Sequence, residues 1–292
     1  MAVYELKNET FAIKINSCGA ELCSLKKIST GIEYMWQADP EFWGKTSPVL
    51  FPFVGGLQDG KYRINGKTYS MPKHGFVMDK EFEMISQTEN EIWFAFNSNP
   101  ETLEIYPYEF VLKLGYRLLP DGVMALFQVE NPGKETLYFS LGGHPGFNCP
   151  IAPGKKQTDY QIRFDTQEDI ISTQIGSTGL AAAGRDIYPL QNGFLPLTEH
   201  MFDHDALIIE DYQAKKISLC DETGTPYVTV TLDSPVFGIW SSAPNRAPFV
   251  CIEPWHGLCD LENYDGELKD RKWENSLEPG GVWKKEYTIQ CK

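Results

Sequence analysis

The segment EFVLKLGYRLLPDGVMALFQVENPGKETLYFSLGG (residues 109–143) decides the fold class of this chain. Its apolar residues alternate with polar ones over short runs, which is the period of a half-buried β-strand. Asp-Gly at 121–122 and Asn-Pro-Gly at 131–133 separate these runs, and both are typical of tight turns. The segment therefore predicts a series of strands joined by turns.

The same pattern recurs along the rest of the chain. KYRINGKTYS (61–70) is centred on Asn65-Gly66, the dipeptide typical of a two-residue hairpin. Further short runs are FAIKINS (11–17), EIWFAFNS (91–98), DALIIED (205–211), KKISLCDETGTPYVTVTL (215–232), VFGIWS (236–241), FVCIEP (249–254) and KKEYTIQC (284–291). The best helical candidate, EDIISTQIGSTGLAAAGRD (168–186), is short and broken by glycines. No linker or repeat is visible, so we expect one all-β domain over residues 1–292, a large antiparallel β-sandwich.

Charge and cysteine content exclude several classes of function. The formal net charge of -14 disfavours binding to nucleic acid or to an anionic membrane surface. Residues 1–17 lack the basic and apolar regions of a signal peptide, and no apolar run is long enough to span a bilayer. The seven cysteines form no CxxC pair, so we expect free thiols, a cytoplasmic location and no metal site of the zinc-knuckle type.

Three titratable residues stand next to turn-forming residues, where side chains from different strands can converge. His74 lies in MPKHGFV, His144 in LGGHPGFNCP, and Glu253 in VCIEPWHG, directly after an apolar strand. An imidazole can donate or accept a proton near neutral pH, and a carboxylate can act as a general base. Trp255 offers an apolar surface on which a sugar ring can stack. This set predicts proton transfer between two oxygen atoms.

Structural roles compete with this interpretation. A single loop histidine is more often a hydrogen-bonded structural residue than a catalytic one. Glu253 at the end of a strand is compatible with an ordinary solvated carboxylate, and Trp255 with a core position. His200, His204 and His256 have neighbours that suggest no chemistry, so only a structural role is predicted for them.

Taken in order along the chain, these motifs resemble those of the aldose 1-epimerases, the galactose mutarotase superfamily, and most of all its LacX-like bacterial branch. GGHPGF and CIEPW are the more specific motifs, and DALI alone is weak. The matching segments are GAELCSLK (19–26), SPVLFPFVGGLQDGKY (47–62), KHGF (73–76), YPYEF (106–110), SLGGHPGF (140–147), DALI (205–208) and FVCIEPWHG (249–257).

The resemblance implies a fold, a reaction and residue roles. The fold is a sandwich of the galactose mutarotase-like (supersandwich) type, as a monomer or homodimer. The reaction interconverts the α and β anomers of a free hexose without a cofactor or metal. Glu253 matches the base and His144 the acid, and His74 matches a histidine that binds the sugar. The residues assigned to substrate binding are Asp205 (or Asp203, two residues earlier), Trp255, Lys73 and Phe147.

Two departures from the family motifs leave alternatives open. Gly56 and Met78 stand where members of this branch often carry arginines that border the sugar site, so planar multi-donor hydrogen bonding is lost. Lys73 and Arg246 are candidates to replace part of it. The alternatives are an epimerase for hexose 6-phosphates, which the lost arginines and the acidic charge disfavour, and a non-catalytic carbohydrate-binding protein on the same scaffold.

Overall fold

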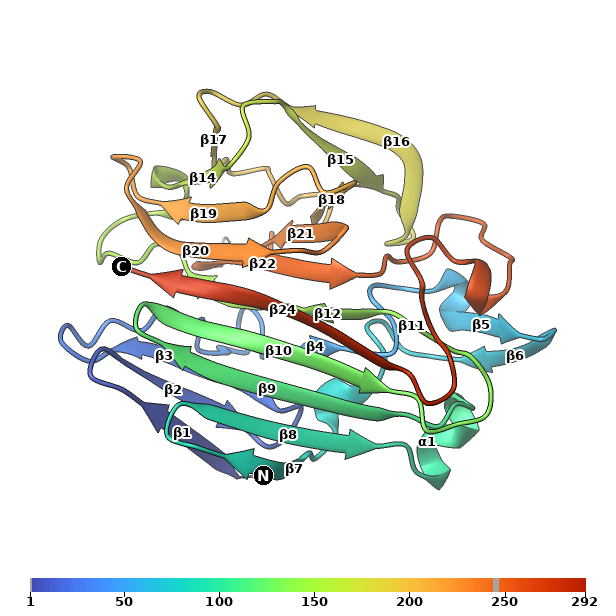
Figure 1. The fold of residues 1–292 in the computed structure, drawn as a ribbon. Helices are drawn as coiled ribbons and strands as arrows, with labels where there is room; N and C mark the ends of the chain where they lie inside the picture. The colour runs from blue at the N-terminus through green and yellow to red at the C-terminus, as the bar shows by residue number, and fades with distance from the viewer. Residues whose placement is uncertain (1, 244–246) are drawn as a thin grey trace.

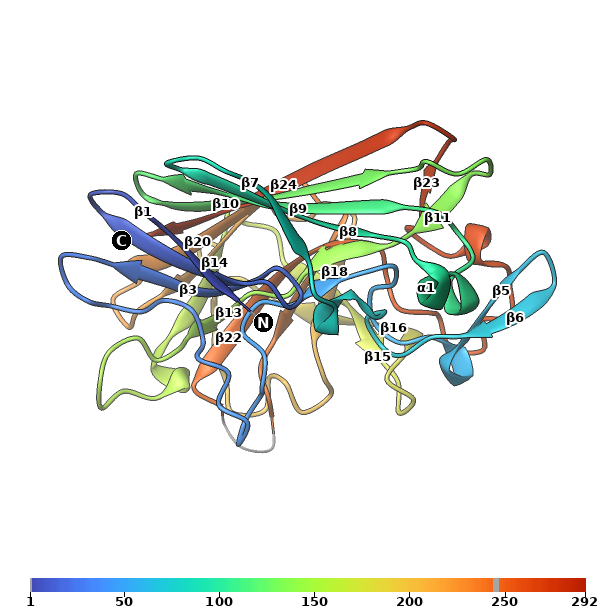
Figure 2. The ribbon, with the colours of Figure 1, turned by 90° about the horizontal axis from the view of Figure 1, so that it is seen from below.

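Two large antiparallel sheets face each other across a shared apolar core in the computed structural model, which describes residues 2–243 and 247–292 (Figures 1 and 2). Within those residues, the first sheet has nine strands, in the order β17 (Phe194–Pro196), β14 (Gln161–Phe164), β19 (Lys216–Cys220), β20 (Pro226–Leu232), β24 (Val282–Cys291), β10 (Gly122–Glu130), β9 (Val111–Leu119), β8 (Glu91–Asn97) and β7 (Glu83–Gln87). The fold class predicted from the alternating runs is confirmed.

The second sheet carries the strands that matter for function. Its order is β16 (Ala181–Tyr188), β15 (Ile170–Ile175), β18 (Leu207–Glu210), β21 (Val236–Trp240), β22 (Phe249–His256), β12 (Leu141–Gly143) and β4 (Val49–Leu50), and β13 (Gly146–Asn148) also pairs with β22. Figure 2 shows β10 and β9 of the first sheet layered over β22 and β18 of the second. All eight residues of β22 are buried, so this strand is central to the molecule.

Smaller elements surround the two sheets. They are the sheet of β1 (Val3–Lys7), β2 (Phe11–Asn16) and β3 (Glu21–Lys27), the pairs β5 (Lys61–Ile64) with β6 (Lys67–Ser70) and β11 (Leu137–Phe139) with β23 (Asn275–Leu277), the helix α1 (Pro100–Ile105), and the 3₁₀ turns η1 (Gln58–Gly60), η2 (Val77–Asp79), η3 (Gln157–Asp159) and η4 (Leu268–Asp270). None of the helices in the described part of the chain has the length and apolarity needed to cross a bilayer.

Local turn chemistry explains the hairpins. In the β5–β6 hairpin, Asn65 and Gly66 have φ values of 49° and 76°, the left-handed conformation that a two-residue turn of this hand requires. β9 and β10 form the hairpin expected at residues 121–122. The turn at 131–133 differs, because β11 pairs with β23 and not with β10. The Asn131 side chain donates to the carbonyls of Glu135 and Leu277, so the chain leaves the first sheet there.

The segment with the strongest helical pattern forms strands. Residues 170–188 contain β15 and β16, which pair with a register shift between Thr173 and Ile175. Gly176 and Gly179 stand in the connection between the two strands, where they close a turn. Pairing with β18 buries Ser172 and Thr173, so the sheet overrides the weak helical preference.

Candidate active site

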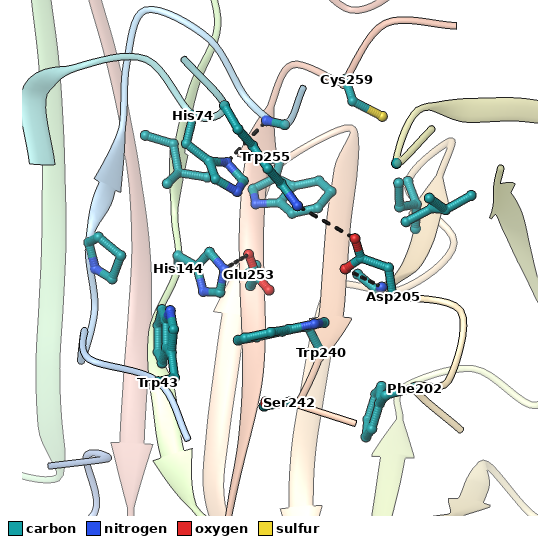
Figure 3. A pocket seen from close by; sticks show the side chains of 18 of the residues that line it. Trp43, His74, His144, Phe202, Asp205, Trp240, Ser242, Glu253, Trp255 and Cys259 are labelled. Atoms are coloured by element: carbon teal, nitrogen blue, oxygen red, sulfur yellow. Dashed lines mark hydrogen bonds and ion pairs between the residues drawn. The ribbon is translucent and has the colours of Figure 1, made fainter. Parts of the chain in front are cut away.

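A cavity of about 540 Å³ opens over the second sheet (Figure 3). Its lining comes from β4, β21 and β22, from the residue after β12, and from the loops around residues 73–78 and 202–206. Figure 3 shows His144 and Glu253 next to each other in its centre, with Asp205 on one side and His74 on another. Three motifs far apart in the sequence therefore meet here.

The pair at the centre consists of His144 and Glu253. Nε2 of His144 lies 3.2 Å from Oε2 of Glu253, and their side chains are 10% and 1% exposed. The two atoms are not aligned as a hydrogen bond, and Oε2 has no hydrogen-bond partner among the described residues. This oxygen is therefore available to accept a proton from a ligand.

The residues around His144 explain its position. Its backbone N–H donates to the carbonyl of Pro48 at 3.0 Å, which ties the residue after β12 to the loop before β4. A Cβ on Gly142 would lie 2.7 Å from the indole of Trp255, and one on Gly143 would lie 3.0 Å from the ring of Tyr287. The two glycines let β12 approach both rings closely, so the following imidazole projects into the cavity.

Burial shifts both members of the pair toward their neutral forms. It lowers the pKa of His144 well below its ordinary value, and it raises the pKa of Glu253 well above its ordinary value. Lys73 opposes the second shift, because its positive charge favours the carboxylate. A carboxylate with a raised pKa is a stronger base, and an imidazolium with a lowered pKa is a stronger acid.

His74 faces His144 across the cavity. Their ring centroids lie 5.8 Å apart at 78°, and the backbone N–H of Gly55 donates to Nδ1 of His74 at 3.1 Å. Burial lowers the pKa of His74 to about 3, so the ring is neutral at pH 7. Because Nδ1 accepts a hydrogen bond, the proton of the neutral ring is on Nε2. His74 thus provides one fixed donor.

Trp255 lies flat against the sheet beside Glu253. Its indole crosses two glycines on the neighbouring strands, Gly142 in β12 and Gly238 in β21, where an added Cβ would come within 2.7 and 2.8 Å of the ring. The side chain is almost fully buried but forms part of the cavity lining. This placement suits the apolar surface that was expected for it.

Two tryptophans and a phenylalanine in the lining have no counterpart among the predicted residues. The Trp43 ring packs on His144 at 4.7 Å and 31°, and the Trp240 ring meets His144 edge-to-face at 5.5 Å. Phe202 lines the side near Asp205 (Figure 3). Trp43 stands in an irregular loop and gives no sequence signal. Trp240 ends a strand and is followed by the loop-forming sequence Ser-Ser-Ala-Pro, which only weakly indicates a site residue.

Asp205 and Lys73 form the polar edge of the cavity. Their Oδ2 and Nζ atoms lie 3.5 Å apart, and both side chains are partly exposed. The negative charge of Asp205 raises the pKa of Glu253, so the two carboxylates are close enough to interact. Asp203 also lines the cavity, but its carboxylate pairs with the exposed His200 at 2.8 Å. Of the two aspartates, Asp205 is therefore the one whose carboxylate interacts with the central pair.

One predicted site residue is not brought to the cavity. Phe147 is fully buried in the main core and is not part of the described lining, because neighbouring residues of β13 point to opposite faces of the sheet. Met78 does line the cavity, and a Cβ on Gly56 would meet Leu180 at 3.3 Å. Arg246, the other candidate cation, lies outside the described residues.

None of the remaining three histidines is part of the described cavity lining. His256 is buried and packs edge-to-face on Trp283 at 5.1 Å, away from the cavity lining. Burial lowers its pKa to about 3. His200 and His204 are exposed. All seven cysteines are free thiols.

Comparison with known proteins identifies one family and similar bacterial proteins over nearly the whole chain. The sequence profile of the family described as aldose 1-epimerase matches residues 2–270. The chromosomally encoded protein LacX of Lactococcus lactis subsp. lactis is 33% identical over 294 residues, covering 98% of both chains. The plasmid-encoded LacX protein of the same organism is also 33% identical, with the same coverage.

Solved structures agree in fold over the whole chain. A galactose mutarotase-related enzyme from Lactobacillus acidophilus has a TM-score of 0.94 and 34% sequence identity, covering 100% of this chain and 97% of the other. A galactose mutarotase-like protein from Lactobacillus casei has a TM-score of 0.94 and 27% identity, with full coverage of both chains.

Proposed function

Because this chain belongs to the aldose 1-epimerase family, as its motifs predicted, we propose that it interconverts the α and β anomers of a free aldohexose. The observation that carries the proposal is the buried pair of His144 Nε2 and Glu253 Oε2, 3.2 Å apart in the cavity of about 540 Å³ over the second sheet. The anomeric oxygen O1 and the ring oxygen O5 are bonded to the same carbon. An acid and a base must therefore converge on one point, as these two do.

The proposed reaction needs two proton transfers in each direction. The carboxylate of Glu253 takes the proton from the O1 hydroxyl while imidazolium His144 donates a proton to O5, and the C1–O5 bond breaks. The product is the open-chain aldehyde, with Glu253 protonated and His144 neutral. After rotation about C1–C2, O5 attacks the other face of C1. The two residues exchange their protons with the sugar in reverse, which regenerates the starting state.

Burial disfavours the charged pair of carboxylate Glu253 and imidazolium His144, so this pair is the less populated form of the site and the more reactive one when it forms. Burial brings the basicity of Glu253 closer to that of a sugar hydroxyl, and it makes protonated His144 a stronger acid. The nearby Lys73 stabilises the carboxylate form that the first step requires. Each well-placed general acid or base contributes about 10² to 10⁴-fold to the rate.

The other lining residues support binding of a neutral sugar. His74 offers its Nε2–H as a donor, and Asp205 with Lys73 offers a charged acceptor and donor for hydroxyl groups. Trp255 provides an apolar surface for a ring face, with Trp43 and Trp240 as walls. The free thiols support the expected cytoplasmic location, which remains a prediction.

A phosphorylated sugar is less well supported. Both lysines of the described lining are engaged by carboxylates, Lys73 by Asp205 and Lys45 by Asp79 at 2.5 Å. Met78 lines the cavity where a guanidinium could have held a phosphate. The non-catalytic alternative also rests on Met78, and it is opposed by the convergence of His74, His144 and Glu253.

The proposal is tested by polarimetry of freshly dissolved α-D-glucose and α-D-galactose and of the corresponding 6-phosphates. We expect the wild-type chain to accelerate the change in rotation of at least one free sugar more than that of its phosphate. Glu253→Gln keeps the shape of the side chain but removes the base, so we expect a loss of about 10²-fold or more in rate. Sugar affinity, measured by tryptophan fluorescence, is expected to stay within a few-fold.

Glu210→Gln is the matched control. Glu210 is also buried in the second sheet, but its carboxylate is held by Lys272 and Trp273 outside the described lining. This variant is expected to lose stability and keep its rate per folded molecule. Full activity of Glu253→Gln would refute the assignment. Sugar binding by a wild-type chain that accelerates no anomerisation would instead favour the non-catalytic alternative.

A further inference from the structure

A third potential ligand atom lies beside the catalytic pair. Cys251 and Glu253 are two residues apart on β22, so their side chains share one face of the strand. Nε2 or Nδ1 of His144, Sγ of Cys251 and an oxygen of Glu253 all lie within 4.8 Å of one another. The proposed epimerase reaction uses no thiol, so Cys251 has no role in it.

These three side chains match the donor set of a zinc site. Zn²⁺ takes imidazole nitrogen, thiolate sulfur and carboxylate oxygen in tetrahedral geometry, with three protein ligands where one position stays open. Two ligands of a tetrahedral zinc lie about 3.3 Å apart, given bond lengths of about 2.0 Å. The observed 3.2 Å between His144 Nε2 and Glu253 Oε2 already has this value. We propose that His144, Cys251 and Glu253 bind Zn²⁺, and that the metal inhibits the chain.

The surroundings of the cluster favour a divalent cation. Cys251 is fully buried and Glu253 is 1% exposed, and Oε2 of Glu253 has no hydrogen-bond partner among the described residues. A metal would satisfy this oxygen and hold the carboxylate and thiolate in their charged forms, which burial alone disfavours, and the protons of the Cys251 thiol and the Glu253 carboxyl would leave to solvent as the metal binds. The thiol makes the site selective, because sulfur ligands favour zinc over magnesium or calcium.

The cavity gives the metal a route to the cluster. His144 and Glu253 are both part of the cavity lining, whereas Cys251 lies behind them beneath the aromatic group of Trp43, Trp240 and Phe249. A zinc ion entering from solvent therefore meets the imidazole and the carboxylate first and the thiol last. Its fourth position faces the cavity, where water can occupy it.

Inhibition follows from the identity of the ligands. A metal on Nε2 and the carboxylate removes the lone pairs that the acid and base need, and it occupies the place of the anomeric carbon. This consequence rests on the proposed function. Binding of the metal does not, so the two parts can fail separately.

The experiment uses the full chain without a histidine tag, reduced and free of chelators. Co²⁺ serves as the spectroscopic probe, because a cobalt–thiolate bond gives a charge-transfer band in the near ultraviolet, and Zn²⁺ then displaces it. Zn²⁺ affinity is measured by calorimetry. Inhibition by Zn²⁺ is measured by polarimetry, as the rate of anomerisation with the metal divided by the rate of the same variant without it. Cys251→Ala is compared with Cys259→Ala, since Cys259 is a second buried thiol and lies in the cavity lining.

The proposal makes different predictions for the two variants. We expect the wild-type chain and Cys259→Ala to show the band, to bind one Zn²⁺ and to be inhibited by it, while equal Mg²⁺ has no effect. Cys251→Ala should lose the band and weaken Zn²⁺ binding by more than about 100-fold. Loss of a residue that only hydrogen-bonds a metal ligand weakens binding by about 10- to 100-fold, so a larger loss identifies Cys251 as a ligand. Absence of the band in the wild-type chain, or its persistence in Cys251→Ala, overturns the site. Binding with an intact epimerase rate overturns only the inhibition.

Discussion

At the scale of single residues, the proposed chemistry depends on two side chains that come from distant motifs. His144 and Glu253 stand in distinctive motifs, and the structure places their reactive atoms 3.2 Å apart. Trp43 and Trp240 could not be predicted, because their positions depend on a loop and a strand end that fold over His144. Phe147 was assigned to the site from its motif alone, and strand alternation turns it into the core.

A substitution can separate the role of His144 as a proton donor from a purely structural role of its buried ring. His144→Asn keeps a polar group of similar size but cannot protonate O5, so we expect the polarimetric rate to fall by about 10² to 10⁴-fold. His256→Asn is the control, since His256 is equally buried but packs on Trp283 outside the described cavity lining. A similar loss of rate in both variants, with equal folded fractions, would show that the effect is structural.

The choice between Asp205 and Asp203 is open to a direct comparison. The carboxylate of Asp205 pairs with Lys73 and interacts with Glu253, whereas that of Asp203 pairs with the exposed His200. We expect Asp205→Asn to raise the KM for the sugar by about tenfold, the loss of one charge-assisted hydrogen bond. Asp203→Asn should change KM less than twofold. A larger effect at Asp203 would reverse the assignment.

At the scale of elements, the sequence predicted the hairpin turns at 65–66 and 121–122, but it did not predict the strand pairing around the site. Asn65-Gly66 specifies its hairpin locally, so β5 and β6 followed from the sequence. β22 pairs with β21, which precedes it closely in the chain, and with β12, which lies more than 100 residues earlier. No local sequence pattern encodes the pairing of β22 with β12. The position of the Trp255 indole flat against the sheet depends on this pairing, because each neighbouring strand contributes a glycine beneath the ring.

Adding a single methyl group beneath Trp255 tests whether the position of its ring matters for sugar binding. Gly238→Ala places a Cβ 2.8 Å from the Trp255 ring, so the indole must shift. We expect a cost of about 1–3 kcal/mol in unfolding free energy and a weaker sugar affinity, measured by urea unfolding and by titration. Gly44→Ala is the control, because its Cβ meets nothing within 4 Å. Unchanged affinity in Gly238→Ala would mean that the sugar does not use this surface.

At the scale of the whole molecule, the alternation of apolar residues predicted the fold class, a large antiparallel β-sandwich. The topology needed more than pattern, since the turn at 131–133 directs β11 to β23 and away from β10. Residues from both ends of the chain, including Leu6 and Cys291, enter one core cluster. Closing such a core also buries histidines, and this has a consequence for stability.

His256 is held neutral by the core, so folding depends on pH. Burial lowers its pKa to about 3, while the unfolded chain keeps the ordinary value of about 6.5. Between these values the unfolded state binds one more proton, so stability falls as pH falls from about 6.5 toward 3. For His256 alone the loss between pH 7 and pH 5 is about 2 kcal/mol. Between the two pH values, the unfolding free energy of His256→Asn, measured in urea, should therefore fall by about 2 kcal/mol less than that of the wild-type chain. The control His204→Asn, which removes an exposed ring, should match the wild type. An equal loss in His256→Asn and the wild type would mean that His256 is protonated in the folded state.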